Sequence, residues 1–306
     1  MKILLIGATG QLGGDILRNN PGHEIIAPGR DQLDLQHIEQ LEKGVRDIRP
    51  DAVINCAAFH NVPLCEEQPE KAFFINCIAV GKLASFCRQY DARLVTFSTD
   101  YVFGGEKRTP YVEGDAPHPL QIYGMTRAAG EHAAIAAAPE HALIIRTCGL
   151  YGRSGAASKG GNFVDNRIVD AKAGNSLEMG SDQVVCPTST DDLSRAVLAL
   201  VEHRGNALGV YHLVNEGECT WFEFTKAIYE ILGLNVDLRP VDRRGLSGSM
   251  RRPLYSVLAN IKARELGISL HPWRMALERY LEERYSCDPA KVSRTATGRF
   301  LKFPYQ

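Results

Sequence analysis

Short apolar runs alternate with amphipathic segments through the first half of the chain. The apolar runs lack polar alternation, which is typical of strands covered on both faces of a sheet. We predict strands over Lys2–Ile6, Glu24–Ala27, Ala52–Asn55, Arg93–Ser98 and Ala142–Arg146. The segments between them show helical spacing of apolar residues, and we predict helices over Gln11–Arg18, Ile38–Ile48, Pro69–Arg88 and Gln121–Ala138. Repeated strand–helix units predict an α/β fold with a Rossmann-like, doubly wound parallel sheet.

The regular alternation weakens after Tyr151, where a Gly- and Ser-rich segment begins. Elements predicted in this second half are helices over Phe163–Ala171, Asp191–Glu202 and Trp221–Leu232, and a strand over Tyr211–Val214. We expect a dinucleotide-binding Rossmann domain from residues 1–150 and 189–215. A smaller, discontinuous substrate-binding lobe would comprise residues 151–188 and 216–306. This lobe would cover the carboxyl ends of the strands, where open α/β sheets bind ligands.

Composition argues against several classes of partner. With a net charge of −1 over 306 residues, the chain offers no electrostatic attraction to nucleic acid or to an anionic membrane. The first apolar run is too short for a signal peptide, and no run reaches the length of a transmembrane helix. The eight cysteines are scattered without C-x-x-C spacing, so we expect neither a metal site nor a disulfide framework. These features predict a cytoplasmic protein with free thiols.

A glycine-rich turn follows the first predicted strand directly. Its sequence, G-A-T-G-Q-L-G, begins at Gly7 and continues through Gly10, Gln11, Leu12 and Gly13 into a predicted helix. Glycines allow a tight turn and a close approach of the backbone to a pyrophosphate, and the helix N-terminus presents free N–H groups to the anion. The turn therefore predicts a dinucleotide site.

Residues after the second strand indicate which dinucleotide binds. Arg30 stands where NAD-selective proteins carry an acidic residue for the ribose 2′-hydroxyl, and a guanidinium suits a 2′-phosphate. We predict that NADPH is preferred and that NADH is also accepted, although the adjacent Asp31 leaves open that Arg30 is a solvated loop residue. Asp34 and Leu35 fit the adenine end. The small residues where the dinucleotide would cross the sheet are Cys56, Ala57 and Ala58.

A hydroxyl and a phenol mark the candidate chemistry. Thr99 follows the fourth strand, Tyr123 stands 24 residues further along, and Arg127 follows Tyr123 by four positions on one helix face. A phenol with a pKa of about 10 needs a nearby cation to act as an acid–base group near neutral pH. Thr99 would hold a substrate carbonyl, while Tyr123 would supply a proton to match hydride from a nicotinamide.

Several motifs occur in order along the chain. They are the glycine turn, C-A-A at residues 56–58, S-T-D-Y-V-F at 98–103, Y-G-x-T with G-E at 123–131, R-T at 146–147, G-N-F at 161–163 and D-Q-x-x-x-P-T at 182–188. Together they resemble the dTDP-4-dehydrorhamnose reductase family of extended short-chain dehydrogenases/reductases, from residue 1 to about 200 and more loosely to about 270. The resemblance implies NAD(P)H-dependent reduction of the 4-keto group of a nucleotide-activated deoxysugar. A homodimer is common in relatives.

Candidate contacts for the nucleotide sugar come from several segments. Asp100 and Tyr101 follow Thr99 at the carboxyl end of a strand, which favours contacts with sugar hydroxyls. His60 lies on a loop near the expected nicotinamide, and Asn162 belongs to the G-N-F motif. Arg252, in an Arg-rich segment, is a candidate for the diphosphate because arginine forks suit phosphate, and a solvated basic loop is the alternative.

Two departures from the family pattern leave other functions open. Arg127 replaces the family's lysine, which lowers the tyrosine pKa and bonds the nicotinamide ribose, and Gly149 replaces a tryptophan that stacks against the sugar. One alternative is a non-catalytic NADP-binding regulatory or binding protein, as in the regulatory β subunit of methionine adenosyltransferase, which resembles the same family. A nucleotide-sugar epimerase or dehydratase is the other alternative, although Thr99 is not followed by the Asp-Glu pair of dehydratases.

Overall fold

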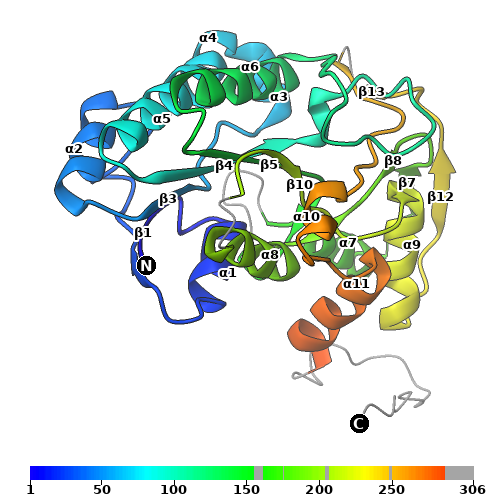
Figure 1. The fold of residues 1–306 in the computed structure, drawn as a ribbon. Coiled ribbons are helices and arrows are strands. Elements are labelled where there is room, and N and C mark those ends of the chain that lie inside the picture. The colour runs from blue at the N-terminus through cyan, green and yellow to red at the C-terminus, as the bar shows by residue number, and fades with distance from the viewer. Residues whose placement is uncertain (155–160, 175, 204–206, 248–249, 287–306) are drawn as a thin grey trace.

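The structure is a computed structural model that describes residues 1–154, 161–174, 176–203, 207–247 and 250–286. A six-stranded parallel sheet in the order β10-β5-β4-β3-β1-β2 forms its larger part (Figure 1). Its strands are β1 (Lys2–Ile6), β2 (Glu24–Ile26), β3 (Ala52–Asn55), β4 (Arg93–Thr99), β5 (Ala142–Thr147) and β10 (Gly209–His212). The predicted α/β fold with a doubly wound parallel sheet is confirmed, and the strand predicted over Tyr211–Val214 begins two residues earlier, at Gly209.

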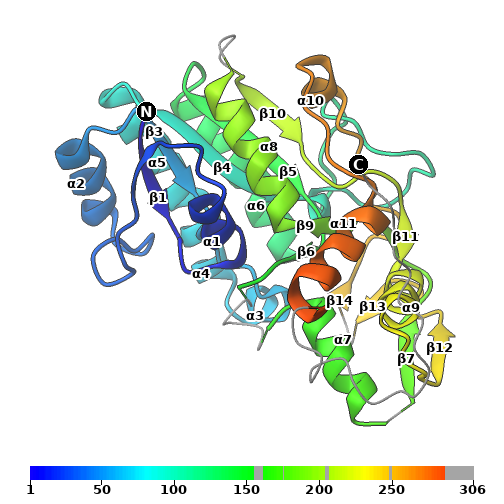
Figure 2. The ribbon, with the colours of Figure 1, turned by 90° about the horizontal axis from the view of Figure 1, so that it is seen from below.

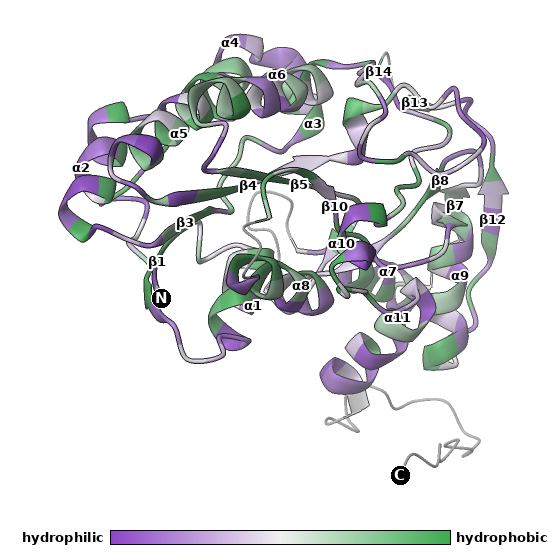
Figure 3. Cartoon of the chain, in the orientation of Figure 1, coloured by the Kyte–Doolittle hydropathy of each residue, from purple (hydrophilic) through white to green (hydrophobic). Residues whose placement is uncertain are grey.

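Helices cover both faces of this sheet, as Figure 1 shows. One face carries α2 (Ile38–Ile48), α5 (Ala79–Gln89) and α6 (Ile122–Ala137), and the other carries α1 (Gln11–Arg18) and α8 (Thr190–Glu202). Successive strand residues point to opposite faces, so Ile3 and Leu5 pack with α1 and α8 while Leu4 and Ile6 pack on the α2 and α5 side. Figure 3 shows hydrophobic and hydrophilic residues in bands along α2, as expected for a helix with one buried face.

The long helix predicted over Pro69–Arg88 is interrupted. The chain forms α3 (Val62–Glu67), α4 (Pro69–Phe73), a π-helical turn η1 (Phe74–Ile78) and then α5. Asn76, buried in this turn, exchanges hydrogen bonds with the backbone of Phe59 and donates to Thr126 Oγ1 at 3.1 Å. The π turn thus directs the Asn76 side-chain amide toward α6. The spacing of apolar residues in the sequence does not reveal such a turn.

Much of the second half forms a smaller cluster of elements beside the sheet (Figure 2). Its helices are α7 (Phe163–Lys172), α9 (Trp221–Leu232) and α11 (Trp273–Leu281), whereas α10 (Ile261–Glu265) packs with the core of the main sheet. Short strands pair β6 (Leu150–Tyr151) with β9 (Thr188–Ser189), β7 (Leu177–Gly180) with β12 (Leu238–Val241), β8 (Val184–Val185) with β11 (Cys219–Thr220), and β13 (Leu246–Ser247) with β14 (Met250–Arg251). An apolar core around Phe224, Ile228 and Leu277 holds α7, α9 and α11 together.

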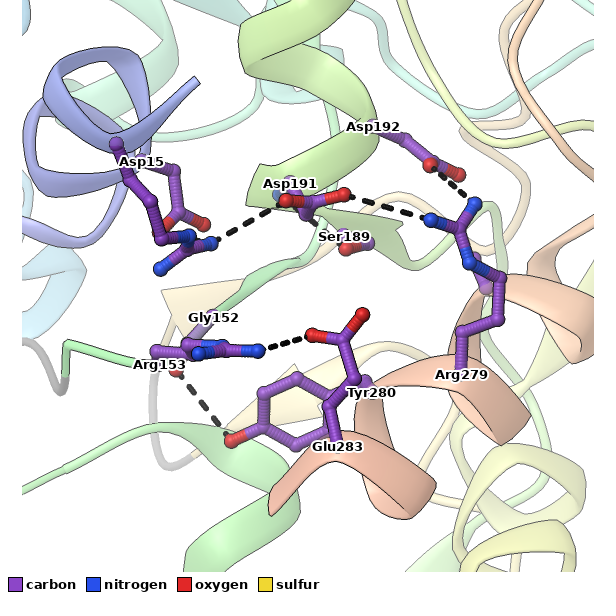
Figure 4. Close-up of a pocket in the computed structure, with 11 residues that line it drawn as sticks. Asp15, Gly152, Arg153, Ser189, Asp191, Asp192, Arg279, Tyr280 and Glu283 are labelled. Atoms are coloured by element: carbon purple, nitrogen blue, oxygen red, sulfur yellow. Dashed lines mark hydrogen bonds and ion pairs between the residues drawn. The ribbon is translucent and has the colours of Figure 1, made fainter.

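Charged side chains join this cluster to the main sheet. Arg279 of α11 lies between Asp191 and Asp192 at the start of α8, and Arg153 pairs with Glu283, as Figure 4 shows. The Arg279 contacts link α11 to α8, which packs directly against the sheet. Within the described residues, no helix has the length and apolar character needed to span a membrane, and no cluster of His, Cys, Asp or Glu could hold a metal. The tail beyond Ser286 lies outside the described residues.

Candidate functional site

The glycine turn between β1 and α1 is built by close backbone approaches. Gly7 has a φ of +82°, and a Cβ there would lie 2.9 Å from the backbone nitrogen of Ala57. At Gly13, a Cβ would lie 2.3 Å from the Gly7 carbonyl oxygen, well inside contact distance. Gly10 N donates to that same carbonyl at 3.1 Å. The turn after β1 therefore packs against the turn after β3, and only glycine fits at both of its ends.

This turn fits an anionic dinucleotide. Gly10 is the N-cap of α1 and offers no side-chain oxygen, and the first turn of α1 contains no acidic residue. The N-terminal N–H groups of α1 therefore lack a side-chain cap, as a pyrophosphate requires. Gln11 presents a buried Oε1 with no hydrogen-bond partner among the described residues. The Leu12 side chain packs into the apolar core, so only its backbone can contribute to this surface.

Arg30, predicted to contact a 2′-phosphate, is tied to Asp34. Arg30 Nε donates to Asp34 Oδ2 at 2.8 Å, while the Arg30 side chain is 76% exposed. Partial burial opposes ionisation of Asp34, but hydrogen bonds from Arg30 and from the backbone of Gln36 outweigh it and lower the Asp34 pKa. Leu35 is buried in the core beneath them. The structure thus brings the predicted Arg30 and Asp34 together at one edge of the sheet.

The loop after β3 faces the glycine turn. Cys56 N continues the sheet by donating to Ile6 O at 2.9 Å, and Ala57 N donates to Asn55 Oδ1 at 3.1 Å. Burial raises the pKa of the Cys56 thiol, so it remains protonated. His60 approaches Ala58 O with its Nδ1 at 3.3 Å. Because Cys56, Ala57 and Ala58 have small side chains, a dinucleotide at this loop would contact mainly the backbone.

The Thr99 hydroxyl and the Tyr123 phenol meet at the carboxyl end of β4. Tyr123 lies in the first turn of α6, whose N-cap Gln121 accepts a hydrogen bond from Gly124 N at 3.0 Å. A Cβ at Gly124 would lie 2.1 Å from the carbonyl oxygen of Tyr101, so glycine lets α6 pack directly on the segment that follows Thr99. The rings of Tyr101 and Tyr123 then meet edge to face, with centroids 6.2 Å apart.

The electrostatic surroundings keep Tyr123 protonated. Burial raises the pKa of the Tyr123 phenol, the Arg127 charge lowers it, the Asp100 charge raises it, and the Thr99 hydroxyl lowers it. The net pKa stays above the usual value for tyrosine, so the phenol can donate a proton at neutral pH. Arg127 is 5% exposed, and its Nε has no hydrogen-bond partner within the described part of the chain. A buried guanidinium with an unused donor fits a bound cofactor hydroxyl or phosphate.

Asp100 is held by protein groups. Thr99 Oγ1 donates to Asp100 Oδ1 at 3.0 Å, and Ser256 Oγ donates to Asp100 Oδ2 at 2.6 Å. Burial raises the pKa of this carboxyl, while Ser256, Cys148 and Thr99 lower it through hydrogen bonds. The carboxyl therefore orients Thr99, and its role as a sugar contact stays a prediction. Tyr101 is the next residue. Burial raises the pKa of its phenol, and the charge of Arg252 offsets part of this effect.

Arg252 and Asn162 occupy different surroundings. Arg252 lies close enough to Tyr101 for its charge to act on that phenol, and its buried Nε has no partner among the described residues. Asn162 instead caps α7: it accepts from Asp165 N at 2.8 Å and donates to Gly152 O and to Tyr280 Oη, both at 2.7 Å. Thr99, Tyr101, Tyr123, Arg127 and Arg252 are brought together, whereas Asn162 is used within the smaller cluster of elements.

Sequence reasoning missed residues whose partners are distant in the chain. Ser256 and Cys148 support Asp100, and Gly124 sets the distance between α6 and Tyr101. The Y-G pair of the motif is the only sequence signal that pointed near Gly124. Gly149 has a φ of +54°, and Cη2 of Trp221 lies 3.1 Å from where its Cβ would be. An aromatic ring from α9 thus packs against the position where the family pattern has tryptophan.

A doubly wound parallel sheet, a glycine turn and a Thr–Tyr pair beside a buried cation define a dinucleotide-binding protein of the extended short-chain dehydrogenase/reductase type. The chain belongs to the family described as RmlD substrate binding domain, whose model matches residues 1–286. The family resemblance inferred from the motifs is thereby confirmed.

Several known proteins are similar over nearly the whole chain. The spore coat polysaccharide biosynthesis protein SpsK of Bacillus subtilis is 37% identical over 290 residues, covering 94% of this chain and 99% of that protein. The dTDP-4-dehydrorhamnose reductase of Escherichia coli is 32% identical over 302 residues, covering 94% and 99%. The crystal structure of dTDP-4-dehydrorhamnose reductase from Bacillus anthracis, in complex with NADP, superposes with a TM-score of 0.86 at 33% identity and covers 92% and 99%.

Proposed function

We propose that the protein reduces the 4-keto group of a nucleotide-activated deoxysugar with NADPH, as a dTDP-4-dehydrorhamnose reductase does. The observation that carries this proposal is the protonated Tyr123 phenol beside Thr99, with Arg127 one helical turn away, whose buried Nε has no hydrogen-bond partner among the described residues. Relatives that bear this activity in their names are 32–35% identical, and a similar structure was solved with NADP. The glycine turn supports binding of the same kind of cofactor, with NADPH preferred and NADH also accepted.

The side chains divide the reaction among them. When bound, NADPH supplies hydride to the carbonyl carbon of the sugar. For this step the Thr99 hydroxyl would turn its single proton from Asp100 Oδ1 to the carbonyl oxygen of the sugar. Tyr123 Oη would give its own proton to that oxygen as the alcohol forms. The Arg127 charge stabilises the phenolate that remains until solvent returns the proton. No acid–base group besides Tyr123 is needed for this sequence of steps.

We extend the proposal to the substrate-binding residues and the division of the chain. Residues 1–150 and 189–215 would form the dinucleotide-binding domain, and residues 151–188 and 216–306 the substrate-binding lobe. Arg252 would bind the diphosphate, which its unused Nε and its position near Tyr101 support. Tyr101 and His60 remain candidates for the sugar, whereas the Asn162 amide is already bonded to Gly152 O, Tyr280 Oη and Asp165 N. A cytoplasmic location and a homodimer stay predictions, to be checked by cell fractionation and by sedimentation.

The decisive experiment follows NADPH oxidation with dTDP-4-dehydrorhamnose and, in parallel, with other 4-keto nucleotide sugars. Turnover that disappears when the 4-keto sugar is omitted supports the reductase. Isomerisation of a 4-hydroxyl sugar with no net oxidation of NADPH would instead indicate an epimerase. The non-catalytic binding protein is the alternative that Arg127, in place of the family's lysine, favours. It replaces the proposal if the parent protein and Arg127→Lys both bind NADPH but neither reduces a 4-keto sugar.

A further inference from the structure

A buried carboxylate, Glu131, lies on the same helix as the candidate catalytic residues. Tyr123, Arg127 and Glu131 follow one another at intervals of four along α6 and therefore share one face of the helix. Arg127 and Glu131 are 5% and 4% exposed. Opposite charges at this spacing ordinarily attract each other, and a low-dielectric interior strengthens the attraction.

Glu131 is nevertheless paired with a different arginine. Arg146 of β5 donates from Nε to Glu131 Oε1 at 2.9 Å and from its terminal nitrogen to Oε2 at 2.6 Å. Both carboxylate oxygens are thus used by a single two-pronged contact, the strongest geometry for this pair of groups. Arg127 has no ion pair among the described residues, and its Nε is without a hydrogen-bond partner there.

Arg146 is fixed from several sides. On the sheet it lies in register with Ser98 of β4 and His212 of β10. Its guanidinium stands over the Phe103 ring, 5.1 Å from the centroid, and approaches His212 Nε2 at 3.5 Å. Burial and the Arg146 charge lower the His212 pKa to about 3, so His212 is neutral at ordinary pH. Among the described residues, the ion pair that Glu131 makes is with Arg146.

We propose that Arg146 is a positioning residue of the reductase site: by holding both oxygens of Glu131, it leaves the Arg127 guanidinium free to act on Tyr123 and on the cofactor. The expected effect on turnover rests on the proposed function, whereas the expected effect on the Tyr123 titration does not. Without Arg146, the nearest cation for Glu131 along α6 is Arg127, one turn away. A neutralised Arg127 would no longer favour the phenolate of Tyr123.

We expect the other groups that face Tyr123 to stay in place in such a variant. They are Asp100 and Thr99 at the end of β4, Cys65 from α3 and Tyr101, while Glu66 accepts from Ile122 N at the start of α6. A shift of the Tyr123 titration caused by loss of Arg146 would therefore come through Glu131 and Arg127. Removing the Glu131 charge as well should cancel the shift, which a merely structural role of Arg146 would not produce.

The test compares Arg146→Met with the parent by NMR of ring-labelled tyrosine, with the Tyr123 signal assigned by its loss in Tyr123→Phe. We expect the Tyr123 titration to move up by about one pH unit, the low end of the effect of a neighbouring opposite charge. The alkaline limb of the turnover profile should move with it. Arg146→Met with Glu131→Gln should return both to the parent values. Arg146→Lys, which keeps the charge but not the two-pronged contact, should move them less than Arg146→Met does.

Arg93→Met is the matched control, because it removes a half-buried arginine of β4 that donates to Leu200 O and Val201 O at the opposite end of the strand. Should Arg146→Met fail to fold, Arg146→Gln gives the same comparison with an uncharged donor. An unchanged Tyr123 titration in a folded Arg146 variant, or no return in the double variant, overturns the inference. Because the titration needs no turnover, an inactive parent would contradict the proposed function and leave this test intact.

Discussion

Ser256 donates a hydrogen bond of 2.6 Å to Asp100 across 156 positions of sequence, and Asp100 in turn accepts from Thr99. The chain Ser256–Asp100–Thr99 connects the end of β4 to a segment of the second half of the protein. Burial alone would leave the Asp100 carboxyl poorly solvated, and the two hydroxyls satisfy one oxygen each. The orientation of the Thr99 hydroxyl therefore depends on a residue far along the chain.

Ser256→Ala should weaken both stability and turnover. Loss of one donor to a buried carboxyl is expected to cost about 1–3 kcal/mol of unfolding free energy. Turnover should fall while the dissociation constant of NADPH stays unchanged, because the glycine turn is untouched. Chemical denaturation and steady-state kinetics measure the two effects. Ser85→Ala, which removes a hydroxyl bonded to its own helix, is the control, and equal behaviour of the two variants would contradict the role of Ser256.

Tyr123→Phe should reduce turnover by at least about a hundredfold, the low end for a positioned acid. The phenyl ring keeps the edge-to-face contact with Tyr101, so the fold and NADPH binding should be retained. Tyr229→Phe is the matched control, since its hydroxyl donates to Arg167 O within the smaller cluster of elements. Turnover of Tyr123→Phe equal to that of the parent would exclude Tyr123 as the proton donor.

Arg30→Ala should weaken NADPH binding and spare NADH binding. A charge-assisted contact to a 2′-phosphate is worth about 1.5–3 kcal/mol, which corresponds to about a tenfold or larger change in dissociation constant. Arg30 is exposed and held by Asp34, so its removal leaves the core intact. Fluorescence titration with both dinucleotides measures the ratio. The assignment of Arg30 fails if the two affinities fall in parallel.

The parts that were predictable from sequence are those that depend on near neighbours in the chain. Each strand of the main sheet is a short apolar run, and the glycine turn is a contiguous motif, so both could be located to within a few residues. Asn162 illustrates the limit: its amide bonds Tyr280 Oη, 118 positions away, and this contact makes it a helix cap with a tertiary partner. Glu131 likewise pairs with Arg146 and not with Arg127, which is nearer in sequence, because of the way α6 packs on β5.

The acid limit of stability should depend on Asp191, at the start of α8. Burial opposes ionisation of this carboxyl, but hydrogen bonds from Asn19 and Arg195 and the charges around it prevail and lower its pKa to about 2. Figure 4 shows Asp191 beside Arg279. A carboxyl whose folded pKa lies below its unfolded value of 3.8 stabilises the protein above that unfolded value. The side chain is 20% exposed, and the shift corresponds to about 2 kcal/mol.

Asp191→Asn should therefore lower the unfolding free energy by about 2 kcal/mol at neutral pH. The difference from the parent should shrink as the pH falls from about 4 to about 2, because the parent carboxyl becomes protonated over that range. Urea denaturation at a series of pH values measures both chains. Asp237→Asn provides the control, since its ion pair with Arg239 is exposed and should contribute little at any pH. If the difference in unfolding free energy between Asp191→Asn and the parent stays constant down to a pH of about 2, the carboxylate charge contributes nothing to stability. The loss would then come from the shape of the side chain alone.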